Sequence, residues 1–470
     1  MKLSIKKIFI LSIILIYVLN VSGCKTLDNT KNRKDHVDSF KQALNKKTIN
    51  QETRYTLDDC LREALQNNLN IKAKQIEKNI SSLNRKAAFS YLLPRIDLNF
   101  QTNTWSKEPL SQIGNDSSGK PMYMTTHEDS FNSAVLNIGF PILTPSAWFL
   151  YSMRKKNEDI SDLSLNLTKQ MISMRVTALY FTIIGLERTK ENIIHRIKSA
   201  KVLNSEISNF YLEGLVPEWK KTRGEAYLLS SKKAKKEIEN AISERKSELL
   251  LEMGYSPLLK INIEKTYSFK IEEFKLKNLI YDALISHPAL YIQDSVIAMQ
   301  KDGVKAALAD FLPNIIGYAN LNKTTNSFVK YSTYWISGIQ GIWSLFNGFK
   351  NLNDYKIAKK KHELEFIKRE EACLSTMLTV TKAYLAYQNS LENLKVTKTY
   401  LQASHQRLQD VEAKWKEGME TNSNYYEIAA DLDYSKTLEI QAEIMLQVSI
   451  ANLYSVRGKT YMGKENINHE

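Results

Sequence analysis

The residue types that most often carry out catalysis or bind metals are scattered along this chain. Its 470 residues include seven histidines and three cysteines, none with a metal-binding spacing such as H-x-x-x-H or C-x-x-C. No serine elbow, phosphate-binding loop or isolated pair of carboxylates at a strand end occurs either. Each lone histidine is therefore expected at the surface or at a helix cap. We predict neither an enzyme nor a cofactor or metal site.

Charged residues do gather after two glycine turns, and the two groups have opposite signs. The first turn, at Gly214, is followed by the bases Lys220, Lys221 and Arg223. The second, at Gly418, is followed by acidic residues, among them Glu427 and Asp431, four residues apart on one helix face. We expect the two groups to pair with each other. The alternative is a solvated tip whose charges pair with nothing, since exposed pairs contribute about 0 to 1 kcal/mol.

The N-terminus predicts one covalent modification. Three lysines precede an apolar run at residues 8–19, and Val21-Ser22-Gly23 places small residues before Cys24. The run is too short to span a bilayer, which needs roughly 20 residues. Residues 1–23 resemble a bacterial lipoprotein signal peptide, which implies cleavage before Cys24 and acylation of that residue. Lys25 then favours the outer membrane, and the alternative is an ordinary export signal with an incidental cysteine.

Composition limits the remaining possibilities. The formal charge is +14, or +11 without the three signal lysines, and the excess is spread over polar helix faces. The densest basic run, residues 232–236, contains no aromatic residue and is expected to be a solvated helix face, so we predict no nucleic-acid partner. Cys60 and Cys373 lie in helical patterns and indicate no disulfide framework. After the signal, no stretch is long enough for a transmembrane helix, so any membrane crossing would use strands.

Two long helices dominate the pattern. Residues 147–211 and 351–415 lack proline and repeat apolar residues at helical spacing, and each would be about 100 Å long. Each ends three residues before a glycine, which is a common left-handed helix cap. A shorter helix follows in each case and ends at Gly254 and Gly458, both forty residues past the turn glycine. These equal offsets indicate a duplicated unit.

The predicted unit has the order helix, two strands, long helix, short helix. The first repeat, 56–254, begins with a helix from Thr56 to Leu93 and has strands near 95–104 and 130–140, separated by a loop rich in turn formers. The second, 276–458, begins with a helix from Leu276 to Phe311 and has strands near 314–322 and 331–343. Residues 24–55 are expected to be a tether with a short helix around 37–44. Residues 255–275 are expected to be a linker, and 459–470 a tail.

The strands alternate between apolar and polar residues. In the first, Ile96, Leu98 and Phe100 alternate with Asp97, Asn99 and Gln101, and in the second Leu136 and Ile138 flank Asn137. Four strands of about 10 residues can span a bilayer but cannot close a barrel, and an open edge in lipid leaves backbone groups unpaired. The sequence therefore predicts an assembly in which the apolar face meets lipid and the polar face lines water.

Several segments carry a resemblance to a known family. Residues 56–68, TLDDCLREALQNN, with Tyr91-Leu92-Leu93-Pro94, resemble the opening of each repeat in TolC-type outer membrane efflux proteins. Residues 279–288, with Phe311-Leu312-Pro313, resemble the opening of the second repeat in the same family. Residues 453–458 resemble the end of that repeat. Leu69 departs from the pattern, because proline is expected where the second repeat has Pro288. The resemblance covers about 400 residues.

This resemblance implies a mostly α protein with a transmembrane β-barrel contribution. Such proteins are homotrimers in which three protomers with four strands each form one 12-stranded barrel, joined to a long α-helical periplasmic tube. The implied function is an outer membrane channel of a tripartite efflux or type I secretion system, lipid-anchored in a Gram-negative outer membrane. A periplasmic adaptor (membrane fusion protein) and an inner membrane pump would be partners. The alternative is a structural or adhesive coiled-coil lipoprotein without a conduit.

The resemblance also implies where the functional residues lie. The periplasmic aperture would be constricted by Glu427, with Asn424 and Asp431 nearby, although Asn424 stands where aspartate is common. The bases Lys220, Lys221 and Arg223 would help to hold the hairpins together. Adaptor hairpins would contact the turns Gly214-Leu215 and Gly418-Met419. The transported substrate is left open.

Overall fold

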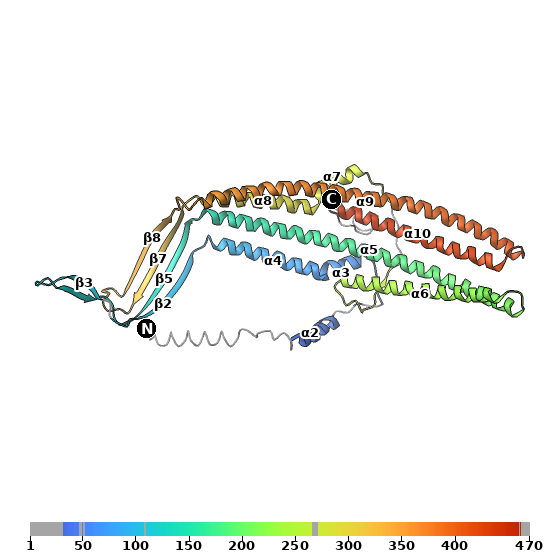
Figure 1. The fold of residues 1–470 in the computed structure, drawn as a ribbon, viewed down its shortest axis with the longest axis horizontal. Coiled ribbons are helices and arrows are strands. Elements are labelled where there is room, and N and C mark those ends of the chain that lie inside the picture. Colours follow the sequence, from blue (N-terminus) through green and yellow to red (C-terminus); the bar gives the residue numbers. More distant parts are fainter. Residues whose placement is uncertain are drawn as a thin grey trace.

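The computed structural model describes residues 32–46, 49, 52–107, 110–265, 271–459 and 461. The signal peptide, Cys24 and the end of the tail lie outside these residues. The described chain is elongated, with a sheet toward one end and long helices extending from it (Figure 1). Among the described helices, none is both long enough and apolar enough to cross a membrane.

Helices make up most of the described chain. They are α2 (Asn32–Lys46), α3 (Leu57–Asn67), α4 (Leu69–Ser90), α5 (Pro145–Leu212), α6 (Glu218–Glu252), α7 (Leu276–Ser286), α8 (Pro288–Ala309), α9 (Lys350–Lys416) and α10 (Asn422–Val456). The strands are β1 (Arg54–Tyr55), β2 (Arg95–Thr104), β3 (Leu110–Asn115), β4 (Pro121–Thr125), β5 (Ser130–Leu143), β6 (Asn262–Ile263), β7 (Asn314–Thr324) and β8 (Thr333–Ile342). The expected helix around 37–44 is present as α2.

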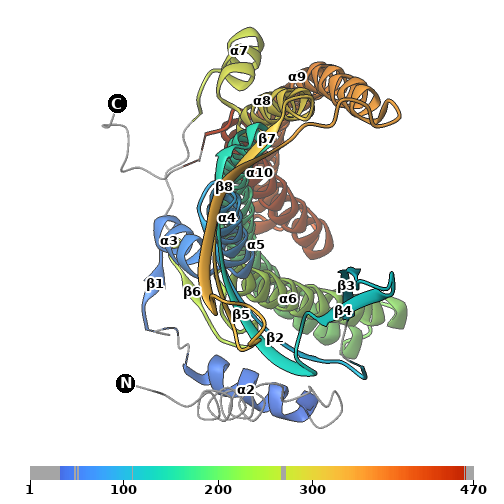
Figure 2. The same ribbon diagram turned by 90° about the vertical axis from the view of Figure 1, so that its left-hand side faces the viewer.

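Both long helices are present without a break. Helix α5 has 68 residues and begins with Pro145, whose missing N–H would have no helical partner at that position. Helix α9 has 67 residues. Near the sheet, α4, α5, α8 and α9 pack side by side in that order, and farther away α6 packs on α5 while α10 packs on both α9 and α5. The result is a curved wall, seen along the long axis in Figure 2.

The main sheet has the order β2-β5-β7-β8, and all its neighbours are antiparallel. Its register places the predicted apolar residues in rows, because Ile96 pairs with Ile138 and Leu98 with Leu136. Asp97 pairs with Asn137, and Asn137 with Asn320, so a second row of polar residues lies on the opposite face. The first two predicted strands therefore have the expected faces.

The region between β2 and β5 is more ordered than the sequence predicts. The expected loop contains a hairpin of β3 and β4, with a bulge between Gln112 and Gly114. Its turn forms because Asp116 accepts hydrogen bonds from the Ser118 and Lys120 backbone N–H groups, at 2.8 and 2.9 Å. The hairpin projects past the end of the main sheet (Figure 1).

Strand β5 also extends farther than predicted. The sequence predicts a strand near 130–140, but β5 continues through Pro141 to Leu143. A register shift between Pro141 and Leu143 accommodates the proline, which has no N–H for the ladder.

Two helices that were expected to be continuous are each broken. The predicted helix from Thr56 to Leu93 divides into α3 and α4 at Asn68, and the one from Leu276 to Phe311 divides into α7 and α8 at His287. At His287 the reason is Pro288, which disfavours helical geometry at the residue before it. Asn68 precedes no proline. Its side chain accepts hydrogen bonds from the N–H groups of Asn70 (2.8 Å) and Ile71 (3.2 Å), so it caps α4.

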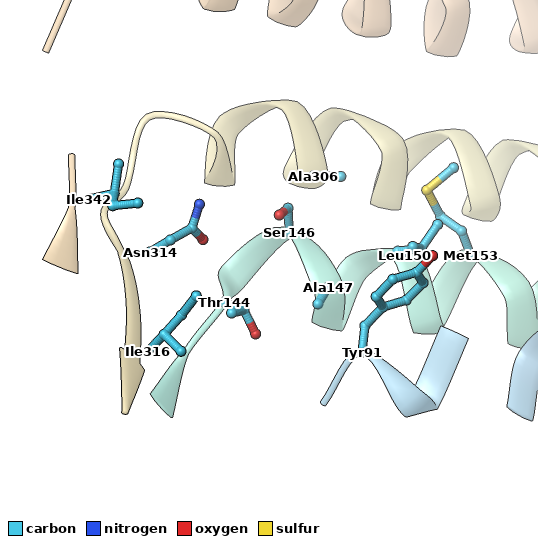
Figure 3. Close-up of a pocket in the computed structure, with 10 residues that line it drawn as sticks. All are labelled: Tyr91, Thr144, Ser146, Ala147, Leu150, Met153, Ala306, Asn314, Ile316 and Ile342. Carbon is cyan, nitrogen blue, oxygen red and sulfur yellow. The ribbon is translucent and has the colours of Figure 1, made fainter. Parts of the chain in front are cut away.

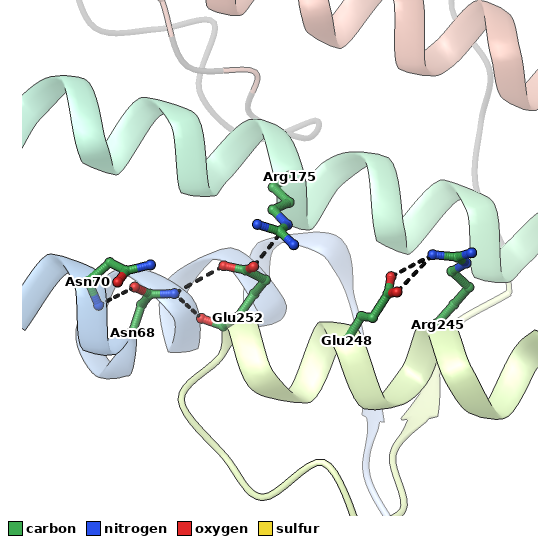
Figure 4. A network of polar contacts seen from close by, with 6 residues as sticks. All are labelled: Asn68, Asn70, Arg175, Arg245, Glu248 and Glu252. Carbon is green, nitrogen blue, oxygen red and sulfur yellow. Dashed lines mark hydrogen bonds and ion pairs between the residues drawn. The ribbon is translucent and has the colours of Figure 1, made fainter.

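The same asparagine connects the break to the end of α6. Its side-chain amide donates to the Glu252 backbone oxygen at 2.8 Å and to its carboxylate at 3.2 Å. Glu252 is buried, and its other oxygen meets Arg175 of α5 at 2.9 Å, as Figure 4 shows. A buried carboxylate requires such partners. In the second half, Ser286 donates to the Arg457 backbone oxygen at 2.9 Å and so connects the other break to the end of α10.

Two buried apolar clusters lie where these elements meet. One surrounds Cys60, Tyr180 and Phe181, and the other surrounds Leu279, Tyr387 and Leu453. Burial raises the pKa of the Cys60 thiol to about 12, so this cysteine is an unreactive core residue. The predicted linker contributes β6, which pairs in parallel with β1 beside the first cluster.

Candidate functional site

The main sheet is open at both sides. Within the described part of the chain, β2 pairs only with β5 and β8 pairs only with β7. Both edge strands have about 10 residues and carry exposed large apolar side chains, including Phe100 on β2 and Trp335 and Ile339 on β8. Long, apolar, unpaired edge strands join other strands readily.

Helix α4 continues the β2 side of the wall with an exposed apolar seam. Its members alternate at spacings of four and three residues, as in a coiled coil: Leu69, Ala73, Ile76, Ile80, Leu83 and Ala87. Ile76 is 59% exposed and Leu83 is 61% exposed. The opposite side of α4 faces α5, where Lys78 meets Asp162 at 2.5 Å. The α4 seam therefore has no partner among the described residues.

Helix α9 continues the β8 side with a second seam of the same period. It consists of Ile357, Leu364, Ile367, Leu374, Leu378 and Leu385, all exposed. This α9 seam includes the polar positions Lys360, Glu371 and Thr381, so it is more mixed than the α4 seam. The two sides of the molecule thus each present an open strand followed by an apolar helix seam.

At the far end, the two predicted glycine turns have the same geometry. Gly214 and Gly418 have φ of +75° and +72°. The next residue closes each turn with a backbone hydrogen bond, from Leu215 to Phe210 at 2.8 Å and from Met419 to Lys414 at 2.9 Å. Both turns are therefore Schellman caps. Leu215 and Met419 are each 66% exposed and give each turn an apolar tip.

The predicted aperture residues lie along the first turns of α10. Glu427 and Asp431 are exposed on one face, and Asp431 lies 3.9 Å from Arg407 of α9. Asn424 has its N–H bonded to the Thr421 hydroxyl at 3.2 Å, and its side chain holds the Glu420 carboxylate, lowering the pKa of that group. Asn424 therefore acts within its own turn, while Glu427 and Asp431 face outward together.

The predicted basic partners do not reach these acids within one chain. Lys220 lies over the Trp219 ring and Lys221 over the Tyr211 ring, at 5.8 and 5.0 Å. Arg223 is exposed. In the described chain no ion pair joins the three bases to Glu427 or Asp431, so the expected contact between the hairpins stays a prediction about an assembly.

Sequence reasoning missed an aromatic cluster at this end. Trp415 stacks on Tyr425 with ring centroids 4.7 Å apart, and Tyr425 meets Tyr426 edge to face at 5.1 Å. Tyr426 is buried; burial, followed by the charge of Glu206 on α5, raises the Tyr426 pKa to about 12. The heptad position of Trp415 was visible in the sequence, but its pairing across the turn was not.

A pocket of about 590 Å³ lies where the sheet joins the helices. Figure 3 shows it between the ends of strands and the first turns of α5. Most of its lining is apolar, and Thr144, Ser146 and Asn314 add hydroxyl and amide groups. None of the described residues that line it is charged.

The described residues contain no group of three or more side chains that could hold a metal ion. His287 is a helix cap, because its Nδ1 accepts the Ala289 N–H at 3.2 Å. Two lysines of the basic run have acidic neighbours, since Lys233 meets Glu237 at 3.2 Å and Lys235 meets Glu239 at 3.7 Å. This arrangement is that of a solvated helix face.

The open sheet, the long helical wall and the paired glycine turns together form a fold that solved outer membrane channels share. Residues 279–459 match the family model described as outer membrane efflux protein, and the resemblance predicted from the sequence is thereby confirmed. A comparison with curated protein sequences gives no match.

Solved structures support the same fold. The CmeC outer membrane channel of Campylobacter jejuni is 15% identical with a TM-score of 0.73, and the alignment covers 87% of each chain. The outer membrane protein VceC of Vibrio cholerae is 12% identical with a TM-score of 0.70, covering 86% of this chain and 97% of VceC. The open-state MtrE outer membrane channel of Neisseria gonorrhoeae is 14% identical with a TM-score of 0.69, covering 86% of this chain and 89% of MtrE.

Proposed function

We propose that this protein is a homotrimeric outer membrane channel and not an enzyme. Three copies would join β8 of one to β2 of the next, so that three times four strands close a 12-stranded transmembrane barrel. The observation that carries the proposal is the match between the two sides of the chain. An open strand and an apolar helix seam lie on each side, so one head-to-tail contact would cover both.

The energies favour closure in a membrane. Each unpaired backbone group of an edge strand costs several kcal/mol in lipid, and joining the strands removes that cost. The α4 and α9 seams have the spacing of helices that pack as knobs into holes, and they would extend the ring into a helical tube. A curved wall, as seen in Figure 2, suits such a ring.

The proposed channel would conduct substrates outward from a periplasmic adaptor and an inner membrane pump, in a tripartite efflux or type I secretion system. The turns Gly214-Leu215 and Gly418-Met419 would contact the adaptor, because each presents an exposed apolar residue on a fixed turn. Six such turns would surround the end of a trimeric tube.

We propose that Glu427 and Asp431 constrict the periplasmic end, with Asn424 fixing the turn from which they project. In a trimer each acid would occur three times around the axis, and like charges brought close repel each other and attract cations. Lys220, Lys221 and Arg223 would relieve this repulsion by pairing across hairpins. Lys220 and Arg223 are exposed and Lys221 is partly exposed, which is consistent with a contact that only the assembly supplies.

The N-terminus would anchor the protein to the outer membrane of a Gram-negative bacterium. Residues 1–23 would be removed as a signal peptide and Cys24 acylated, leaving residues 24–55 as a lipidated tether. The repeats would occupy 56–254 and 276–458, separated by the linker 255–275 and followed by the tail 459–470. Loss of palmitate labelling in Cys24→Ser would support the anchor, and labelling that persists would contradict it.

Conductance in planar bilayers tests the channel. We expect the purified protein to have a crosslinked mass about three times that of the monomer and to conduct ions, at least after the tip acids are substituted. If the trimer conducts no ions, even after the tip acids are substituted, the proposal is contradicted. That result would favour the alternative, a structural coiled-coil lipoprotein without a conduit.

A further inference from the structure

Helix α2 is not buried by any other element in the part of the chain that the structure describes. Its described side chains, residues 33–42, are all exposed, and they include Val37 (44%) and Phe40 (61%), three residues apart on one helix face. A helix of 15 residues is only marginally stable in water, and most helices gain their stability by packing an apolar face. We therefore expect a partner from outside the described chain to cover Val37 and Phe40.

The connection after α2 keeps this face away from the main sheet. Ile49 is buried in the cluster around Cys60 and follows Lys46, the last residue of α2, by three residues. Helical rise up to Lys46 and extended chain beyond it place Val37 within about 25 Å of Ile49. Helix α4, which leads from this cluster to the sheet, has 22 residues and is about 33 Å long. Lipid around the sheet is thus out of reach for this face.

Helix α7 has an apolar face that is open to solvent. Its inner residues Leu279 and Ala283 are buried in the second cluster. On the outer side, Tyr281 is 66% exposed and Ile285 is 52% exposed. These two residues lie four apart in the helix and therefore share one face.

The duplicated helix α3 shows that the repeat itself does not require this apolar face. Helices α3 and α7 have 11 residues each and hold equivalent places, directly before the two helix breaks. Arg62 and Gln66 of α3 occupy the positions of Tyr281 and Ile285, and they are also exposed. The same outward face is thus polar in one repeat and apolar in the other. This difference is expected if a partner covers α7 and solvent covers α3.

A head-to-tail ring would bring α2 of one copy to α7 of the next. Seen along the long axis, α2 lies at the β2 end of the curved wall and α7 at the α9 end (Figure 2). The two helices lie at a similar level along that axis (Figure 1). The charges suit a contact, because residues 32–46 contain four bases and two acids, a net charge of +2, and Glu273 is exposed just before α7.

We propose that α2 of each copy packs on the outward face of α7 in the neighbouring copy, with Val37 and Phe40 against Tyr281 and Ile285. The proposal rests on the proposed function, because only a ring places the two helices together. Three such contacts form a belt around the outside of the tube, at the level of the buried clusters. The tether therefore stabilises the trimer in addition to carrying the proposed anchor.

Crosslinking of two differently tagged chains tests which copy α2 contacts. One chain carries Val37→Cys and the other Ile285→Cys, both with Cys373→Ser, while Cys60 stays because it is buried. The two chains are produced together, and a short bismaleimide is added to isolated membranes. We expect a product that contains both tags and has twice the monomer mass. The matched control replaces Ile285→Cys by Gln66→Cys, the equivalent exposed position on α3, and should give no such product.

Native mass spectrometry measures what the contact contributes. We expect Val37→Asn with Phe40→Asn to raise the dissociation constant of the trimer roughly tenfold. Gln42→Asn, on the opposite face of α2, should leave it unchanged. An unchanged dissociation constant in the double variant would overturn the belt.

The same samples separate this inference from the proposed function. Trimers that form without a product joining the two tags, or that give an equal product with Gln66→Cys, would overturn the belt and leave the channel standing. If the unmodified protein forms no trimer, the proposed function itself is contradicted, and the belt is contradicted with it.

Discussion

The α4 seam offers the sharpest test of assembly. Fully burying an isoleucine contributes about 1.5 to 3 kcal/mol, and Ile76 and Ile80 are 59% and 51% exposed in the single chain. Covering the exposed part of each side chain therefore adds about 1 kcal/mol, or about 2 kcal/mol per interface. A ring of three has three identical interfaces, so Ile76→Ala with Ile80→Ala should weaken the trimer by about 6 kcal/mol, roughly a 10⁴-fold change in its dissociation constant.

Native mass spectrometry over a dilution series in detergent measures that change. The matched control is Gln75→Ala, an exposed residue of the same helix outside the seam, and it should leave the trimer unchanged. Leu374→Ala with Leu378→Ala, in the α9 seam, should weaken the trimer to a similar degree. If the α4 variant dissociates at the same concentration as the Gln75 control, the seam does not form the contact and the ring is arranged differently.

Four further predictions follow from the geometry. A lysine at Leu136 should cost about 2 to 4 kcal/mol in the membrane and lower the yield of assembled protein, whereas Asn137→Lys should be tolerated. Equal yields would mean that the strand is misassigned. Gly214→Ala should cost about 1 kcal/mol through its positive φ alone. Gly254→Ala should lower the melting temperature further, because its Cβ would lie 2.2 Å from the Asn67 oxygen, and equal melting temperatures would contradict this close packing. Burial lowers the pKa of His287, so the neutral cap contributes stability above about pH 6.5 that is lost as the pH falls toward the folded-state pKa. In His287→Asn, the melting temperature should therefore change less between pH 7 and pH 5. An unchanged dependence of the melting temperature on pH would exclude His287 as the source of that dependence. Reversing Lys220, Lys221 and Arg223 to glutamate should raise resting conductance, with partial rescue by Glu427→Lys, and unchanged conductance would remove these bases from the proposed aperture.

The elements that the sequence predicts correctly are those whose conformation is decided by one local signal. The lengths of α5 and α9 follow from uninterrupted helical spacing. Each helix is followed by a glycine that adopts positive φ, Gly214 after α5 and Gly418 after α9. A local signal also sets the start of α3, where Thr56 and Asp59 form a capping box and the Asp59 N–H donates to the Thr56 hydroxyl at 3.2 Å. In these cases all the interacting residues lie close together in the sequence.

The misses occurred where distant residues decide. Asn68 caps α4 through local hydrogen bonds to Asn70 and Ile71, but its amide is also held by Glu252, 184 residues away, and the local pattern does not contain that partner. The Trp415 and Tyr425 stack depends on the path of the turn between them, and the contact of Tyr426 with Glu206 depends on α10 packing against α5. For β7 and β8, adjacent isoleucines and interspersed glycines hide which face is apolar until the register is known.

The β3–β4 hairpin breaks the similarity between the two halves of the chain. The corresponding connection between β7 and β8 contains only residues 325–332 and has no hairpin of its own. A trimer would therefore present six similar turns at one end of its tube and only three long hairpins at the other. An antibody raised against the hairpin would find three equivalent epitopes, each standing clear of the main sheet (Figure 1). A bivalent antibody that spans two of these epitopes would gain avidity over its single-arm fragment. At the opposite end of the tube, a ligand made of two linked adaptor-like units would find six turns, twice the number of hairpin epitopes.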